Sequence, residues 1–249
     1  MKVRWTEPWQ EQVKGSWWKA IVTVIGAFIA MFVWSIGVST VNILRSGLSQ
    51  DALLNLTPEE ALAVSGVNEW TNLASEIVML IALLLLMRAF KLKLFDFKSL
   101  QWRGVGFTIL VYIGTFLLVI VYSYFMVLLD PSRVTTGNQA LIEEAFAQVS
   151  PLVMFISIAV YAPLWEEIVF RGFVMKYIFP NWPIVGAIAS AVIFAGLHMP
   201  AGSVWLDFGV YFIMGMGLVV VYWRTRKIEY AILFHFIQNS VGVLMMLSQ

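Results

Sequence analysis

Two uncharged apolar runs, each long enough to cross a bilayer, constrain this chain more than any other feature. Residues 20–44 form a run of 25, and residues 104–129 form a run of 26. A helix needs about 20 apolar residues to span the ~30 Å hydrocarbon core. Hydrophobic residues make up 60% of the 249 residues and charged residues 12%, which indicates an integral membrane protein. Because the first run is too long for a signal-peptide core, we interpret it as a retained helix.

The whole pattern predicts an all-α fold, a polytopic transmembrane bundle of about seven helices, with an active-site cavity between the C-terminal helices. No internal repeat or low-complexity segment is visible. We therefore expect one integral membrane domain over residues 1–249, with a catalytic core in residues 150–247. Besides the two runs, the expected helices are residues 67–87, 149–179, 183–198, 208–223 and 230–247.

The loops alternate in charge along the chain. Basic residues concentrate in 1–19, 88–103 and 224–227, whereas 45–66 and 130–148 are polar and acidic. Cytoplasmic loops carry the excess of Lys and Arg, so we expect a multi-pass protein of the cell membrane with a cytoplasmic N-terminus. Tryptophans among the basic residues of the first segment predict that it lies at the membrane interface.

Two adjacent carboxylates, Glu166 and Glu167, lie within the apolar C-terminal half. A charge at the bilayer centre costs about 2.5–3.5 kcal/mol on insertion scales, so a functional role is the default hypothesis. On a helix, Glu167 and Arg171 are four residues apart and can pair on one face. Glu166 lies roughly 140° around the helix from Arg171 and cannot pair in the same way. We interpret Glu167 as the structural acid and Glu166 as the acid left for chemistry.

The chain contains only two histidines, His198 and His235. Phe194 precedes the first by four residues and Asn239 follows the second by four, so each pair shares a helix face. A free carboxylate, two imidazoles and an amide suit hydrolysis by water. The carboxylate and one imidazole would take a proton from water, while the other imidazole and the amide would stabilise the oxyanion.

Helix length predicts that the first acid and the first histidine lie at the same depth. Glu166 precedes the turn at residues 180–183 by 14 residues, and His198 follows that turn by 15. At about 1.5 Å per residue, both lie some 21–23 Å from the turn in an antiparallel hairpin. We therefore expect these two side chains to share one site.

At these residues the chain resembles the CAAX-protease and bacteriocin-processing (Abi) family of glutamate intramembrane proteases. The three motifs of that family are Glu-Glu-x-x-x-Arg, Phe-x-x-x-His and His-x-x-x-Asn/Asp. They occur here in order, at residues 166–171, 194–198 and 235–239. The resemblance covers roughly residues 150–245, and no motif position departs from the pattern.

The resemblance implies an endopeptidase that works within the membrane. Carried over position by position, it gives Glu166 as the base and His198 as its partner, with His235 and Asn239 as the oxyanion site. The Phe194 ring is expected to pack around an imidazole. Eukaryotic relatives act on C-terminal prenylated CAAX proteins, whereas many other relatives have different substrates. For this chain we expect a membrane-associated peptide or protein as substrate, and neither a metal nor another cofactor.

Three alternatives remain open at this stage. A zinc-dependent membrane protease could use Glu166, His198 and His235 as ligands, although no His-Glu-x-x-His pair is present. A proton-coupled carrier could use buried Glu and His as a relay. A bacteriocin self-immunity or peptide-binding protein of the same family could use the bundle for recognition. A net charge of +1 with no basic block argues against nucleic acid, and the lack of cysteine excludes a cysteine nucleophile. Nothing in the sequence predicts an oligomeric state.

The predicted topology can be tested with reporter fusions placed in four successive loops. Fusions after Phe97 and Lys227 should report cytoplasm, and fusions after Gln50 and Asn138 should not, because basic loops are retained on the cytoplasmic side. A cytoplasmic signal from the Gln50 or Asn138 fusion would contradict this topology.

Overall fold

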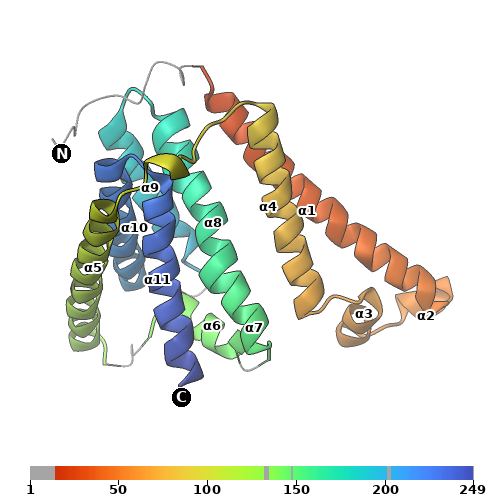
Figure 1. The fold of residues 1–249 in the computed structure, drawn as a ribbon. Helices are drawn as coiled ribbons and strands as arrows, with labels where there is room; N and C mark the ends of the chain where they lie inside the picture. Colours follow the sequence, from red (N-terminus) through yellow and green to blue (C-terminus); the bar gives the residue numbers. More distant parts are fainter. Residues whose placement is uncertain (1–14, 132–134, 147, 201–202, 249) are drawn as a thin grey trace. The chain divides into compact units, whose positions relative to one another are not determined.

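The computed structural model describes residues 15–131, 135–146, 148–200 and 203–248, and within these residues all regular structure is helical, with no strand. The predicted all-α membrane bundle is confirmed (Figure 1). The segment predicted to lie at the membrane interface comprises residues 1–19. Its residues 1–14 lie outside the described residues. Among the described residues, six helices are long and apolar enough to cross a membrane: Trp17–Ser46, Glu69–Ala89, Trp102–Leu129, Pro151–Ile178, Trp205–Thr225 and Ile228–Leu247.

The chain divides into two compact units. One comprises Ile21–Leu92, and the other comprises Met1–Ala20 together with Lys93–Gln249. All the motif residues lie in the second unit. The prediction of a single membrane domain over residues 1–249, with a catalytic core in 150–247, stays a prediction.

In the Ile21–Leu92 unit, two apolar helices are connected by a polar loop. Helix α1 (Trp17–Ser46) and helix α4 (Glu69–Ala89) contact each other through a hydroxyl pair. The Oγ atoms of Ser35 and Ser75 are 3.2 Å apart. Hydroxyl hydrogen bonds of this kind join helices where the surrounding lipid offers no polar partner.

The loop between these helices contains α2 (Gln50–Leu54) and α3 (Pro58–Ser65). Helix α3 begins at a reciprocal pair of hydrogen bonds, because the Thr57 hydroxyl accepts from the Glu60 N–H and the Glu60 carboxylate accepts from the Thr57 N–H. This capping box satisfies two backbone donors that a helix start leaves open. The hydrogen bond from the Thr57 backbone lowers the pKa of the Glu60 carboxyl.

The helix that carries the two glutamates alternates between α and π geometry. Its 28 residues run from Pro151 to Ile178 without a break. The π-helix is rare and is frequently found at functional sites. Pro163 lies in the middle and removes one backbone donor. The successive segments are α7 (Pro151–Met154), a π segment (Phe155–Tyr161), α8 (Ala162–Glu167) and a second π segment (Ile168–Ile178).

The remaining helices of this unit pack around α10 (Trp205–Thr225). It contacts α5 (Trp102–Leu129), α9 (Pro183–Leu197) and α11 (Ile228–Leu247), and α9 also contacts the second π segment (Figure 1). Helix α6 (Gly137–Phe146) is short and polar. The three motifs are therefore carried by elements that pack on one another. The predicted cavity between these helices stays a prediction.

Helix α9 is too short to cross a bilayer. Its 15 residues extend about 22 Å, against the ~30 Å of the hydrocarbon core. It ends at Leu197, His198 is its C-cap, and Pro200 follows two residues later. The chain becomes helical again at Trp205. The described residues between these helices are irregular.

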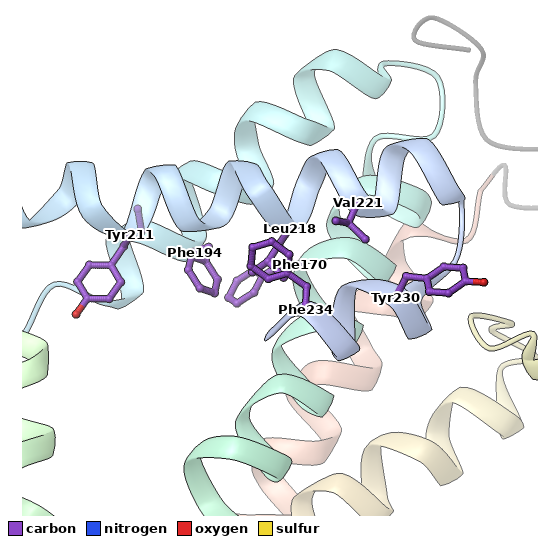
Figure 2. Close-up of a cluster of buried hydrophobic side chains, with 8 residues drawn as sticks. Phe170, Phe194, Tyr211, Leu218, Val221, Tyr230 and Phe234 are labelled. Atoms are coloured by element: carbon purple, nitrogen blue, oxygen red, sulfur yellow. The ribbon is translucent and has the colours of Figure 1, made fainter. Parts of the chain in front are cut away.

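A hydrophobic cluster fills the space between the helices of this unit. Figure 2 shows Phe170, Phe194, Leu218 and Phe234 gathered at its centre, with side chains contributed by four different elements. Lipid is as apolar as these side chains, so the cluster stabilises the bundle through close packing more than through removal from water. Its buried members are Phe170, Phe194, Ala195, Tyr211, Leu218, Val221, Tyr230 and Phe234.

Helices α9 and α10 approach closely at Gly215. A Cβ atom at this position would lie 3.2 Å from the Cα atom of Ala191 and 3.3 Å from its carbonyl oxygen. Backbone atoms cannot yield as a flexible side chain can, and small residues allow such helix approaches in membranes. Gly114 of α5 has no atom within 4 Å of the same hypothetical Cβ.

We predict that Gly215→Ala destabilises the protein and that Gly114→Ala does not. Overpacking at the α9–α10 contact should cost about 1–3 kcal/mol, whereas Ala in an open helical position should improve helix propensity. Thermal unfolding of the two variants in detergent, followed by tryptophan fluorescence, compares them directly. Equal melting temperatures for both variants would contradict the close packing.

Candidate active site

The Glu167–Arg171 pair is fully buried at the centre of the unit. Arg171 Nη1 donates to Glu167 Oε1 at 2.9 Å, and both side chains are 0% exposed. Arg171 Nη2 donates to the Gly215 carbonyl at 3.0 Å. The guanidinium also lies over the Phe194 ring, 4.9 Å from the ring centroid, within the range of a cation–π contact. The pairing expected for these two residues is therefore present.

The same carboxylate oxygen also binds the second motif histidine. His235 Nδ1 lies 2.9 Å from Glu167 Oε1. An ionised carboxylate can only accept, so Nδ1 carries the proton and donates. Glu167 is thus shared between Arg171 from its own helix and His235 from α11. This contact fixes the orientation of the imidazole and leaves its Nε2 atom for other partners.

The first motif histidine is held by the end of its own helix. His198 Nδ1 lies 2.8 Å from the Phe194 carbonyl oxygen, which accepts from it. The last carbonyls of a helix lack backbone donors, and a histidine in this position can satisfy one of them. The Phe-x-x-x-His spacing therefore fixes the tautomer: when the ring is neutral, its Nε2 atom is an acceptor.

Glu166 faces that acceptor across a gap. His198 Nε2 and Glu166 Oε2 are 4.0 Å apart, and the two side chains are 21% and 12% exposed. This distance is too long for a direct hydrogen bond and suits one bridging water. Glu166 Oε2 is buried and has no hydrogen-bond partner in the described residues. The structure thus brings together the two groups that the hairpin arithmetic placed at one depth.

The Phe194 ring packs between the two histidines. Its centroid is 4.4 Å from that of His198 and 5.7 Å from that of His235. The ring is 0% exposed, which agrees with the expectation that it packs around an imidazole. Through this ring and the Arg171 guanidinium, the acidic motif and both histidine motifs form one contiguous cluster.

Tyr211 is a site residue that the sequence did not reveal. Its ring stacks on His198 with centroids 4.8 Å apart and an interplanar angle of 22°. Its hydroxyl lies 2.7 Å from Thr136 Oγ1. Tyr211 therefore restrains the orientation of the His198 imidazole. No spacing rule links position 211 to position 198, so no sequence signal pointed to it.

Asn239 is held by the irregular helix rather than by the histidines. Its Nδ2 donates to the Ile158 carbonyl at 2.8 Å. In π geometry this carbonyl would accept from residue 163, which is a proline without an N–H. One of the two amide hydrogens is thereby used, and the second remains available as a donor. Pro163 was the sequence signal that could have suggested this contact.

A metal site needs several Asp, Glu or His side chains close enough together to bind one ion. Across the part of the chain that the structure describes, no group of three or more Asp, Glu or His side chains lies close enough together to hold a metal ion. Glu166, His198 and His235, the ligands that the zinc-protease alternative would use, thus do not form one ligand set among the described residues. The expectation of hydrolysis without a metal stays a prediction.

These features define a multi-pass helical membrane protein with a buried Glu, Arg and His cluster. Residues 148–241 match the family model described as Type II CAAX prenyl endopeptidase Rce1-like. The resemblance indicated by the three motifs is confirmed for this segment.

Two relatives from Lactococcus lactis are similar over about half of the chain. UPF0177 protein YaiH of subspecies lactis (strain IL1403) is 32% identical over 129 residues, which are 51% of this chain and 52% of the relative. The UPF0177 protein in the abiGi 5′ region of subspecies cremoris is 32% identical over 131 residues, 52% of this chain and 54% of the relative. The chain thus spans about half the length of these relatives. No solved structure matches the chain significantly.

The two glutamates should respond differently to loss of charge. Glu167→Gln should destabilise the protein by roughly 3–5 kcal/mol, because it leaves the buried Arg171 without its counter-charge. Glu166→Gln should melt close to wild type, because Glu166 contacts no cation within hydrogen-bond distance. The measurement is thermal unfolding of both purified variants in the same detergent. A stable Glu167→Gln beside an unfolded Glu166→Gln would reverse these roles.

Proposed function

We propose that this chain is an intramembrane endopeptidase that hydrolyses a peptide bond of a membrane-associated protein or peptide. Glu166 and His198 activate the water, and His235 and Asn239 stabilise the oxyanion. The observation that carries the proposal is the 4.0 Å gap between Glu166 Oε2 and His198 Nε2, with the tautomer of His198 fixed by the Phe194 carbonyl.

Two acceptors at this separation are suited to orient a water molecule. A water about 2.8 Å from each would donate one proton to the carboxylate and the other to the imidazole. Its lone pairs then point away from both groups, toward an incoming carbonyl carbon. As the oxygen attacks, Glu166 takes the proton as general base. The proton is later delivered to the leaving amine, so the carboxylate acts in turn as base and acid.

In this proposal, His235 and Asn239 supply the hydrogen-bond donors to the oxyanion. With Nδ1–H donating to Glu167, His235 can donate to an oxyanion only through Nε2–H, which requires the imidazolium form. Asn239 contributes its second amide hydrogen. Donors held in place by protein contacts before the reaction need no reorganisation, which is the main source of oxyanion stabilisation.

The family match supports this proposal over its alternatives. The matched model is named for a prenyl endopeptidase, and its span includes all three motifs. A zinc protease would need a ligand set that the described residues do not form. A proton carrier would use the same Glu and His side chains. It would not require the fixed hydrogen-bond donor at Asn239. A self-immunity or peptide-binding role remains compatible with the same cluster.

Terminal-fragment mass spectrometry of cell membranes tests the proposal. Membranes with wild-type protein should yield new protein termini that are absent with Glu166→Ala, at equal amounts of folded protein. The same termini should persist with phenanthroline present. Identical fragment sets for both proteins would refute peptidase activity, and reversible loss of the termini with the chelator would refute the metal-free mechanism.

Asn239→Ala should lower turnover by about 100- to 1,000-fold, because removal of one oxyanion donor typically costs this much. Substrate binding should change far less, since the donor acts on charge that develops during the reaction. Gln238→Ala, at the neighbouring position on α11, serves as a matched control. The check is the rate of fragment formation at saturating and at limiting substrate. An Asn239→Ala variant that loses binding while keeping its turnover would contradict the oxyanion role.

A further inference from the structure

Helix α10 carries a buried acid that the proposed mechanism does not use. Asp207 lies in its first turn and is 0% exposed. One of its carboxylate oxygens, Oδ2, accepts from the Gly137 N–H at 3.0 Å. Gly137 is the first residue of α6, and the first N–H groups of a helix lack backbone acceptors and favour a negative charge. Asp207 therefore anchors the start of α6 to α10.

A second contact between the same two helices lies one turn further along α10. Tyr211 follows Asp207 by four residues, so the two side chains share one face of the helix. Tyr211 Oη lies 2.7 Å from Oγ1 of Thr136, the residue before Gly137, and both side chains are buried. Thr136 Oγ1 also accepts from the Gln139 N–H at 3.3 Å, as an N-cap hydroxyl does. The hydroxyl that holds Tyr211 is thus itself held by the start of α6.

The start of α6 approaches the start of α10 closely because Gly137 has no side chain. A Cβ atom at Gly137 would lie 2.9 Å from Ser203 Oγ and 3.5 Å from Asp207 Oδ2. A larger residue would therefore push the start of α6 away from the acid that caps it. Close packing and two polar contacts together fix the position of Thr136 relative to α10.

The Tyr211 ring connects these contacts to the active site. It lies at one end of the hydrophobic cluster (Figure 2) and stacks on His198, with the ring centroids 4.8 Å apart and an interplanar angle of 22°. The hydrogen bond between His198 Nδ1 and the Phe194 carbonyl fixes one atom of the imidazole. One hydrogen bond still allows the imidazole to tilt, which would move its Nε2 atom. A stacked ring resists this tilt, and the Tyr211 ring is itself fixed where its hydroxyl is bound.

We propose that Tyr211 and Thr136 are positioning residues for His198, so that the start of α6 takes part in catalysis. Thr136 holds the Tyr211 hydroxyl, and the Tyr211 ring holds the plane of the imidazole. His198 Nε2 is thereby kept 4.0 Å from Glu166 Oε2, the separation that suits one bridging water. This inference rests on the proposed function, which assigns that water to Glu166 and His198.

The first test needs no substrate and uses nitrogen NMR of the purified full chain with isotope-labelled histidine. The chain contains only two histidines, so the spectrum of His198→Gln assigns both imidazoles. Tyr211→Phe keeps the ring and removes its hydroxyl, and Thr136→Val removes the partner hydroxyl. Tyr177→Phe is the matched control, because Tyr177 is also buried and its hydroxyl donates to the Lys93 carbonyl at 3.1 Å.

Tyr211→Phe and Thr136→Val should both shift and broaden the ring signals of His198. The signals of His235 should stay as they are, and Thr136→Ser and Tyr177→Phe should give the wild-type spectrum. The second test is the rate of fragment formation. Tyr211→Phe and Thr136→Val should lower turnover by as much as about 100-fold with little change in KM, because a misplacement of about 1 Å can cost this much.

Unchanged His198 signals in Tyr211→Phe would overturn the proposal, and so would equal shifts in Tyr177→Phe. Shifted signals together with wild-type turnover would show a purely structural contact and would also overturn it. If the wild-type protein forms no fragments, the proposed function fails. The NMR comparison then decides by itself whether Tyr211 and Thr136 position His198.

Discussion

The carboxylate of Glu167 is the interaction on which the rest of the catalytic unit depends. One oxygen, Oε1, accepts from Arg171 at 2.9 Å and from His235 at 2.9 Å, and the guanidinium continues to the Gly215 carbonyl. Four elements, α8 with Glu167, the second π segment with Arg171, α10 and α11, are thereby joined at a point where all the charged side chains are buried. A charge removed from water is costly unless it is paired, so this arrangement specifies one packing of the helices.

That constraint separates the roles of two chemically identical neighbours. Glu167 is used in structure, and Glu166 is left facing His198 across 4.0 Å. The rings of Phe170 and Phe194 pack against the Arg171 guanidinium, and electrostatic interactions are stronger in such buried surroundings than in water. In the proposed mechanism, the structural acid therefore orients the oxyanion donor, while its neighbour carries out the proton transfer.

Much of this arrangement follows from sequence. Helix spacing predicted the Glu167–Arg171 pair, because four residues bring two side chains to one face, and the turn at 180–183 predicted that Glu166 and His198 meet. The partner of His235 could not be predicted, since contacts between distant helices depend on packing and not on spacing. The stacking of Tyr211 on His198 could not be predicted for the same reason. The Asn239 contact depends on π geometry and on the missing N–H of Pro163, an irregularity that α-helical periodicity does not register.

A double-mutant cycle between Glu166 and His198 tests the central claim most directly. Glu166→Asp withdraws the carboxylate, His198→Gln replaces the imidazole, and the rate of fragment formation is compared for wild type, both single variants and the double variant. If the two groups hold one water, either change alone removes most of the shared effect. The double variant should then be within about threefold of the slower single variant. A double variant slowed by the full product of the two single effects would show independent action and contradict the account.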